Sequence, residues 1–142
     1  MIEELPATGL DNTLGFTFDE AGPDRVVVSW TVAEHHLQPY GIVHGGVHCA
    51  AVETGASVGA ALWFADRGQV VGVSNHTNFL RATRVGDRLV ATATPIHRGR
   101  SQQLWQVEIV DNAQRQVARG EVRLQNLASS GSSSVGSNRP LR

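Results

Sequence analysis

One segment constrains the fold of this chain more than any other. Residues 42–64 are almost entirely small or apolar and contain a single carboxylate, Glu53. The segment is about as long as a membrane span, but it also holds His44, His48 and several glycines, which a lipid-facing helix would not carry. We therefore predict a buried helix of a globular domain that ends before Gly68, a residue typical of helix C-termini.

Five strand-like runs flank this predicted helix. They cover residues 24–32, 70–81, 87–97, 102–110 and 116–127. Turn-forming residues separate the last four runs, and the short connections predict antiparallel neighbours. Trp105, Val107 and Ile109 alternate with polar residues, so we expect them to share one face of a strand. One helix against one antiparallel sheet is an α+β arrangement.

Composition narrows the class of protein. The 142 residues are 41% hydrophobic and 18% charged, which suits one domain with a real core. A net charge of −1 gives no global field for binding nucleic acid. A single cysteine excludes an intrachain disulfide. The N-terminus lacks the apolar segment of a signal peptide, and we expect a cytoplasmic protein without a membrane segment.

The composition changes after Leu127. Residues 128–142 are rich in serine and glycine and nearly free of apolar side chains. Such a segment cannot bury enough surface to order itself. We predict one domain over residues 1–127 and a flexible tail over residues 128–142.

Glu53 stands out on the predicted helix. On a helical wheel one side, expected to pack on the sheet, carries Val47, Ala51, Val58 and Leu62. The side around Glu53 carries Gly46, Cys49, Ala56, Ser57 and Ala60. Small residues let a ligand or a second helix come close, and a lone carboxylate there is a candidate base or nucleophile. A solvated helix face is the alternative, although such faces normally carry several charges.

Two further features of the helix have competing interpretations. Ser57 lies one turn beyond Glu53 and could hold a water for it, or bond to its own helix backbone. Gly45 and Gly46 expose amides at the positive end of the helix dipole, which suits an oxyanion, or they only permit close packing. His48 diverges from Glu53 on the wheel, so no metal site is predicted.

The string Gln38–Gly46, with Glu53 and Ser57 behind it, resembles the hotdog-fold acyl-CoA thioesterases. The likeness is greatest to the 4-hydroxybenzoyl-CoA thioesterase type, which is related to thioesterases of the phenylacetate and menaquinone pathways. It covers about residues 10–127. The resemblance implies a long helix wrapped by a curved antiparallel sheet, an acyl-CoA substrate and no separate cofactor, since coenzyme A is part of the substrate.

The resemblance also implies roles for individual residues. Glu53 corresponds to the catalytic carboxylate, and Gly45 to the helix N-terminal amide donor. Gln38 and His44 match residues of the family's site, and Ser57 matches its hydroxyl residue. The expected reaction is thioester hydrolysis, in which the Gly45 amide, with Gln38 nearby, stabilises the oxyanion. Glu53 either activates a water or attacks the thioester directly.

The spacing of these groups predicts a shared site. Gly45 and Glu53 are eight residues apart in the sequence. At the rise of an α-helix, this spacing is roughly 12 Å along one helix. They cannot both touch one thioester carbon, but an antiparallel partner helix would bring Glu53 of one chain to Gly45 of the other. We expect a homodimer with shared active sites, and the resemblance implies a homotetramer built from two such dimers.

Arginines are the expected contacts of coenzyme A, because all basic residues of the chain are arginine. The predicted turn formed by Arg98, Gly99, Arg100 and Ser101 offers two guanidiniums and a hydroxyl for the nucleotide or pantetheine end. A solvated hairpin turn is the alternative. Arg81 and Arg84 form a second candidate patch. Asn75 adds polarity to a central run and could line the acyl pocket or bond to the loop near Gln38.

The substrate is the least determined element. Ala56 and Ala60 suggest a short pocket, which favours an aromatic acyl group over a long fatty chain, and 4-hydroxybenzoyl-CoA is the first candidate. 1,4-Dihydroxy-2-naphthoyl-CoA and phenylacetyl-type esters stay open. Other hypotheses are a non-catalytic acyl-CoA-binding hotdog protein, against which Glu53 argues, and a hotdog hydratase or dehydratase, whose Asp/His constellation the sequence lacks.

Overall fold

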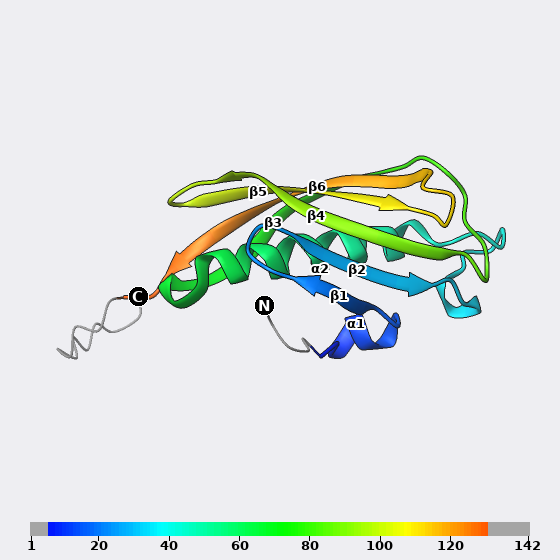
Figure 1. The fold of residues 1–142 in the computed structure, drawn as a ribbon, viewed down its shortest axis with the longest axis horizontal. Coiled ribbons are helices and arrows are strands. Elements are labelled where there is room, and N and C mark those ends of the chain that lie inside the picture. Colours follow the sequence, from blue (N-terminus) through cyan, green and yellow to red (C-terminus); the bar gives the residue numbers. More distant parts are fainter. Residues whose placement is uncertain (1–5, 131–142) are drawn as a thin grey trace.

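The fold is one long helix held against one curved sheet (Figure 1). The computed structural model describes residues 6–130. Its helical elements are α1 (Gly9–Thr13), η1 (Glu34–His36), α2 (Gly45–Phe64) and η2 (Ala65–Arg67). Its strands are β1 (Thr17–Ala21), β2 (Val26–Thr31), β3 (Gly68–Phe79), β4 (Arg88–Arg98), β5 (Gln102–Val110) and β6 (Gln116–Ala128). The predicted tail lies outside the described residues from position 131 onward.

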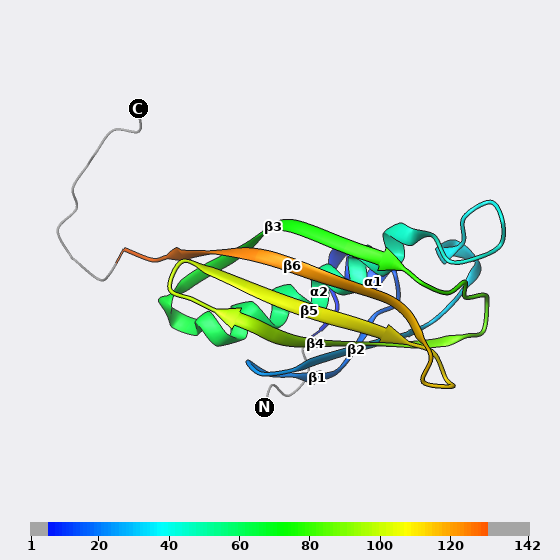
Figure 2. The same cartoon turned by 90° about the horizontal axis from the view of Figure 1, so that it is seen from above.

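All six strands form a single antiparallel sheet in the order β1-β2-β4-β5-β6-β3. The sheet curves over α2 and covers it along its length, as Figure 2 shows from above. β1 and β3 are the two edges of the sheet. The arrangement confirms the predicted hotdog architecture, in which a curved antiparallel sheet wraps around one long helix.

The sequence interpretation missed the N-terminal elements. It expected one strand before the helix, whereas the structure has α1 and β1 ahead of β2. β1 has no fully buried residue, so its sequence lacks the apolar alternation by which strands are recognised. β2 has five buried residues in succession and is shorter than the predicted run. β6 ends at Ala128, and the Ser129 amide still donates to the Arg67 carbonyl at 2.9 Å.

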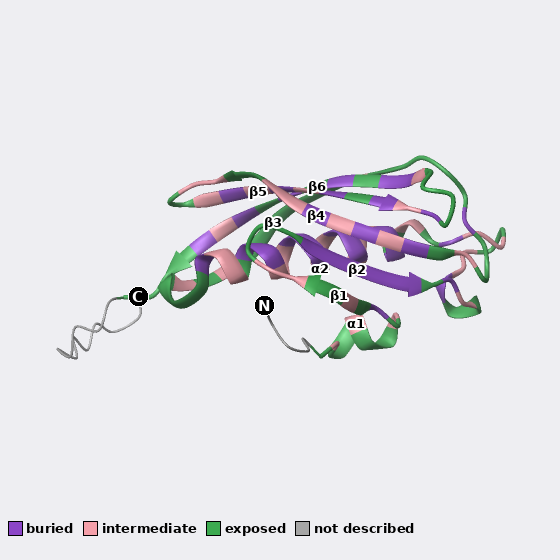
Figure 3. Ribbon diagram, viewed as in Figure 1, coloured by how far each residue is buried: buried purple, intermediate pink, exposed green. Residues whose placement is uncertain are grey.

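The face of α2 that packs on the sheet agrees only in part with the predicted one. Val47 and Ala51 are buried as predicted, whereas Val58 and Leu62 are only half-buried. The core also takes in Val52, Ala56 and Ala60, which are fully buried. Apolar residues occur on all sides of this helix, so their spacing does not single out a face. Figure 3 shows buried bands alternating with less buried ones along α2. The short distances from Gly55 and Gly59 to the strands show that the buried side faces the sheet. Ala56 and Ala60 therefore belong to the core and do not shape a substrate pocket.

Small residues on this face let the sheet come very close. A Cβ at Gly59 would lie 2.6 Å from the ring of Trp105 on β5, and a Cβ at Gly55 would lie 3.2 Å from that of Ala93. Trp105, Val107 and Ile109 are fully buried on this strand, which confirms the predicted alternation. Within residues 6–130 no helix is long and apolar enough to cross a membrane.

Candidate active site

The N-terminus of α2 presents one backbone amide without an acceptor. His44 is the N-cap, and its Nδ1 accepts a hydrogen bond from the Gly46 amide at 2.8 Å. The Val47 amide donates to the His44 carbonyl at 2.9 Å. Among the described residues the Gly45 amide has no hydrogen-bond acceptor, as expected at the first position of a helix. His44 thus caps the helix, and the Gly45 N–H can donate a hydrogen bond to a ligand.

The loop before the helix places Gln38 beside this amide. The Gln38 side-chain oxygen accepts from the Tyr40 amide, and the Gln38 amide donates to the Ile42 carbonyl at 2.9 Å. Gly41 has a positive φ of 79°, and glycine adopts this conformation without steric cost, which makes the tight turn possible. With its side-chain oxygen bound, the Nε2 group of Gln38 is the part that can donate to a ligand.

A cavity of about 360 Å³ opens next to these donors. It is lined by Gln38, Ile42, Val43, Gly45, His48, Phe79, Leu80, Arg81 and Ala82. The structure therefore brings three predicted site residues together, namely Gln38, Gly45 and Arg81. It also adds Phe79, whose ring lies so close to Gly45 that a Cβ there would be 2.6 Å from Cζ.

Glu53 lies farther along α2 and is held at both carboxylate oxygens. Ser57 Oγ donates to Oε1 at 3.3 Å, so the two residues share one side of the helix as expected, and the hydroxyl bonds to the carboxylate directly. Asn75 Nδ2 reaches across from β3 to Oε2 at 3.1 Å and to the Cys49 carbonyl at 3.1 Å. Thr77 Oγ1 in turn donates to Asn75 Oδ1 at 2.8 Å. Asn75 thus contacts the carboxylate, and it does not line the cavity beside Gly45.

Gly72 makes room for this carboxylate. A Cβ at position 72 would approach Glu53 Oε1 more closely than any real contact of a Cβ atom. The pairing of β3 with β6 shifts register between Gly72 and Ser74, which marks an irregularity of the strand at the same place. Sequence reasoning missed Gly72, because an isolated glycine in a strand signals a bulge or a close approach without naming the neighbour.

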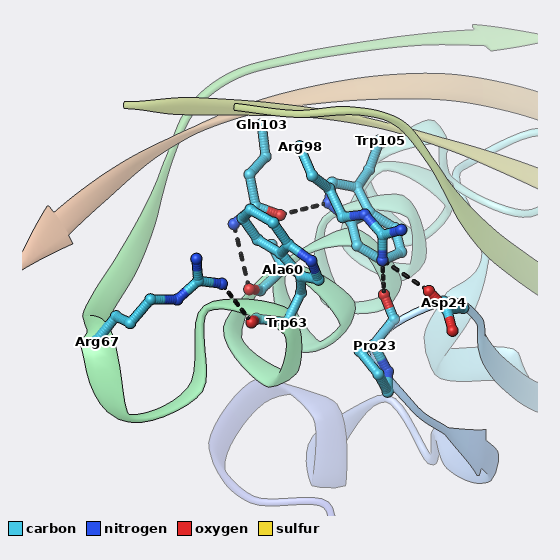
Figure 4. Close-up of polar contacts among 8 residues, drawn as sticks. All are labelled: Pro23, Asp24, Ala60, Trp63, Arg67, Arg98, Gln103 and Trp105. Carbon is cyan, nitrogen blue, oxygen red and sulfur yellow. Dashed lines mark hydrogen bonds and ion pairs between the residues drawn. The ribbon is translucent and has the colours of Figure 1, made fainter. Parts of the chain in front are cut away.

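The predicted arginine turn lies at the other end of α2 (Figure 4). Arg98 Nη1 contacts Asp24 Oδ1 at 2.7 Å and the Pro23 carbonyl at 2.8 Å. Its guanidinium carbon lies 5.5 Å from the centre of the Trp63 ring. Gln103 Nε2, on the adjoining strand, donates to the Ala60 carbonyl at 3.2 Å. The turn is therefore not beside Gly45, which lies roughly 22 Å from Ala60 along the helix.

The members of the turn differ in what they contact. Asn126 Nδ2 donates to the carbonyls of Gly99 and Arg100 at 3.0 and 3.1 Å, which fixes the turn backbone. Ser101 and Arg100 are exposed. Arg98 is committed to Asp24, so Arg100 is the member best placed to bind an anion. Residues 6–130 contain no group of three or more side chains suited to holding a metal ion.

Comparison with known proteins identifies the family. The sequence profile of the Thioesterase superfamily matches residues 40–118. Protein Rv1847 of Mycobacterium tuberculosis is 49% identical over 120 residues, which cover 82% of this chain and 85% of that protein. The 1,4-dihydroxy-2-naphthoyl-CoA hydrolase of Escherichia coli K12 is 33% identical over 117 residues, which cover 80% of this chain and 85% of the hydrolase.

Solved structures agree with this match. The crystal structure of AziG from S. sahachiroi has 54% sequence identity and a TM-score of 0.84, and the alignment covers 86% of this chain and 98% of AziG. Fold, family profile and relatives point the same way, and none of the relatives described here is named for 4-hydroxybenzoyl-CoA. The chain therefore belongs to the thioesterase superfamily, and it is a hotdog-fold thioester hydrolase.

Proposed function

We propose that this hydrolase acts on an aromatic acyl-CoA, with Gly45 and Gln38 as oxyanion donors and Glu53 as base or nucleophile. The single observation that carries the proposal is that one helix holds two functional groups in fixed positions. A helix N-terminal amide without an acceptor opens onto a cavity, and a carboxylate two turns further on is held by Ser57 and Asn75. Donors fixed before substrate arrives stabilise developing charge without reorganisation.

In this mechanism the thioester carbonyl oxygen accepts hydrogen bonds from the Gly45 amide and the Gln38 side chain. Glu53 then removes a proton from a water that attacks the carbonyl carbon, or its own oxygen attacks to form an anhydride that water cleaves. The carbon–sulfur bond breaks and coenzyme A leaves as a thiolate. In the general-base route, the Ser57 hydroxyl orients the water.

The two groups come together only between two chains in this proposal. β3 is an edge strand twelve residues long, with Val71 and Val73 44% and 53% exposed. A long apolar edge is a ready template for pairing with another strand. Pairing with β3 of a second copy through a two-fold axis would run the two α2 helices antiparallel.

The contacts of β3 set the register that such a dimer needs. Gly72 lies against Glu53, and Phe79 lies against Gly45. A two-fold axis passing between Asn75 and His76 would set Gly72 opposite the partner's Phe79 in the extended sheet. Glu53 would then face the partner's Gly45, which is the shared site predicted from the spacing of the two residues. The homotetramer implied by the family resemblance stays a prediction.

The acyl group is proposed from the cavity and the relatives. The cavity beside Gly45 has apolar walls from Ile42, Val43, Phe79 and Leu80, and its size suits a small rigid acyl group. 4-Hydroxybenzoyl-CoA is one candidate. The Escherichia coli relative is named for 1,4-dihydroxy-2-naphthoyl-CoA, which favours that ester as the second candidate.

Thiol release from a panel of acyl-CoA esters tests the proposal. The panel contains 4-hydroxybenzoyl, 1,4-dihydroxy-2-naphthoyl, phenylacetyl and palmitoyl thioesters, assayed with the native chain and with Glu53→Ala. We expect an aryl ester to be preferred and Glu53→Ala to lose about a hundredfold or more in kcat. Glu108→Ala, which removes an exposed carboxylate on β5, serves as the matched control. Preference for palmitoyl-CoA, or full activity of Glu53→Ala, contradicts the proposal.

A further inference from the structure

His48 is buried beside the candidate active site without a hydrogen-bond partner. Its relative exposure is 3%, and it lines the same cavity as Gly45 and Gln38. Its Nδ1 is buried and has no partner among the described residues, and its Nε2 takes part in none of their hydrogen bonds. The ring lies between Trp30, 6.4 Å away, and Phe79, 6.0 Å away, measured between ring centres. It therefore spans from the core to the cavity wall.

An imidazole in this position needs an explanation. Leaving a buried polar group without a partner destabilises the folded state, and such groups are rare in native proteins and call for a specific reason. An apolar residue would fill the place between Trp30 and Phe79 without that cost. His36, by contrast, is also buried but bonds at both ring nitrogens, to the Ala33 amide and to the Leu14 carbonyl. His48 differs because its free edge meets a cavity.

The protonation state restricts what His48 can recognise. Burial lowers the pKa of His48 to about 4. The ring is neutral near pH 7, with one nitrogen as donor and the other as acceptor. A neutral ring pairs with a hydroxyl, which can also donate or accept, and it gives no charge to attract a carboxylate or a phosphate.

The surroundings indicate which part of the substrate reaches it. Arg81 and Leu80 are exposed at the cavity rim, whereas His48 is buried. The polar pantetheine arm of an acyl-CoA therefore suits the rim. The apolar walls around His48 suit the acyl group, and the thioester carbonyl is fixed between them by Gly45.

We propose that His48 is a specificity-determining residue, whose ring hydrogen-bonds to a hydroxyl carried by the acyl group in the cavity beside Gly45. The inference rests on the proposed aryl-CoA hydrolysis and narrows it to hydroxylated acyl groups. It also gives a reason for a polar side chain at an otherwise apolar position of α2.

The test compares hydroxylated and plain substrates in matched variants. The values of kcat/KM are measured for the three monohydroxybenzoyl-CoA isomers and for benzoyl-CoA. The proteins are the native chain, His48→Phe, His48→Gln and, as a control outside the cavity, His97→Gln, which changes an exposed histidine of β4. We expect the native chain to favour one hydroxylated isomer by about tenfold, as one hydrogen bond allows. His48→Phe should lose this preference, while His48→Gln retains part of it and His97→Gln retains it.

Binding provides a readout that does not depend on turnover. Hydroxyphenacyl-CoA and phenacyl-CoA are thioethers that cannot be hydrolysed, and their affinities are measured by calorimetry for the same proteins. The ¹⁵N chemical shifts of the His48 ring in the native protein should change when the hydroxylated thioether binds and should stay unchanged when the plain thioether binds. This measurement needs no variant, so it holds even if His48→Phe does not fold.

The outcomes separate the two proposals. If no aryl thioester is hydrolysed but the hydroxyl still improves binding through His48, the proposed function fails and the assignment of His48 stands. An equal loss for benzoyl-CoA and its hydroxylated isomers in His48→Phe overturns the assignment, because His48 would then bind the pantetheine arm. A hydroxyl preference that survives in His48→Phe overturns it as well.

Discussion

Asn75 on the edge strand donates a 3.1 Å hydrogen bond to the Glu53 carboxylate on the central helix. The same amide group donates to the Cys49 carbonyl, one turn earlier on α2. The two bonds leave the carboxylate little freedom relative to the strand. Asn75 is thus a positioning residue for Glu53, and this role could not be read from the sequence, which showed only an unusually polar strand.

Removing this amide should lower turnover more than it lowers stability. For Asn75→Ala we expect a roughly tenfold loss in kcat, because one hydrogen bond to a charged group is lost, with little change in KM. Steady-state kinetics and a thermal melt measure both quantities. Asn78→Ala is the matched control, since Asn78 lies on the same strand and makes no side-chain hydrogen bond with the described residues. Equal effects of the two variants would contradict the role.

A methyl group at position 72 should displace the carboxylate. The added Cβ of Gly72→Ala would collide with Glu53 Oε1, so the glutamate side chain must move. Misplacing a catalytic group by about 1 Å can cost up to roughly a hundredfold in rate, and we expect a loss of at least tenfold. Gly22→Ala, whose Cβ would meet only the Arg25 carbonyl at 3.6 Å, is the control. An unchanged kcat in Gly72→Ala would remove Gly72 from the site.

Subunit mixing distinguishes a shared site from a site within one chain. Glu53→Ala and Gln38→Ala should each be nearly inactive alone. If Glu53 acts with Gln38 of the other chain, each mixed dimer contains one intact site, and an equal mixture should regain about a quarter of the native rate. A site built within a single chain regains nothing on mixing. The measurement is thiol release after co-refolding of the two variants.

Stability should fall as the pH drops below the ordinary histidine range. Burial lowers the pKa of His48 from 6.5 to about 4, so the unfolded chain binds this proton more readily than the folded one. The contribution of His48 to the free energy of unfolding is complete above the pKa that the residue has in the unfolded chain. It is lost progressively as the pH falls towards the lower pKa of the folded chain, and it amounts to about 3 kcal/mol. Desolvation also lowers the pKa of His36, which adds in the same direction.

Urea unfolding at several pH values across this range checks the dependence. The difference between the native protein and His48→Gln isolates the histidine from the carboxylates that titrate in the same range. We expect the free energy of unfolding of His48→Gln to vary less steeply with pH. Parallel curves would show that His48 is not protonated on unfolding.

The arginine turn can be divided into a structural and a binding part. Arg98→Ala should lower the melting temperature, because it removes the contacts to Asp24 and Pro23. Arg100→Ala should leave the melting temperature unchanged and raise KM for acyl-CoA about tenfold, if Arg100 binds a phosphate. The matching acyl-pantetheine, which lacks the nucleotide, should not respond to Arg100→Ala. Equal responses of both esters would place the nucleotide elsewhere.

Sequence patterns predicted the central helix and most of the strands, because each has a long apolar or alternating run between clear turns. They missed β1, whose five residues are never fully buried. They identified only part of the buried face of α2, namely Val47 and Ala51, since a helix with apolar residues all round gives no preferred direction. The small-residue strip was real, but it serves sheet packing at Ala56 and Ala60.

The site residues also divide into those that could be predicted from the sequence and those that could not. Gln38 and Gly45 meet at one cavity, and Ser57 contacts Glu53, in line with the family resemblance. Arg81, which its charge alone made a second candidate for coenzyme A, lines the same cavity. Gly72 was not singled out, and His48 was considered only as a metal ligand, because the importance of both residues depends on their neighbours in the folded chain. The closeness of position 72 to Glu53 and the lack of a partner for the His48 ring among the described residues are properties of the folded chain. They cannot be predicted from a local sequence pattern.

The close contact between Gly59 and Trp105 has a consequence for substrate range. With an indole ring pressed against its backbone, α2 can neither slide nor turn beneath the sheet without a clash. Gly45 and Glu53 both lie on this helix, so their separation along it stays at roughly 12 Å. Because the two residues serve different active sites of the proposed dimer, this distance fixes the spacing of the two sites, and substrates of different size must be accommodated by the cavity walls and the loops at the rim.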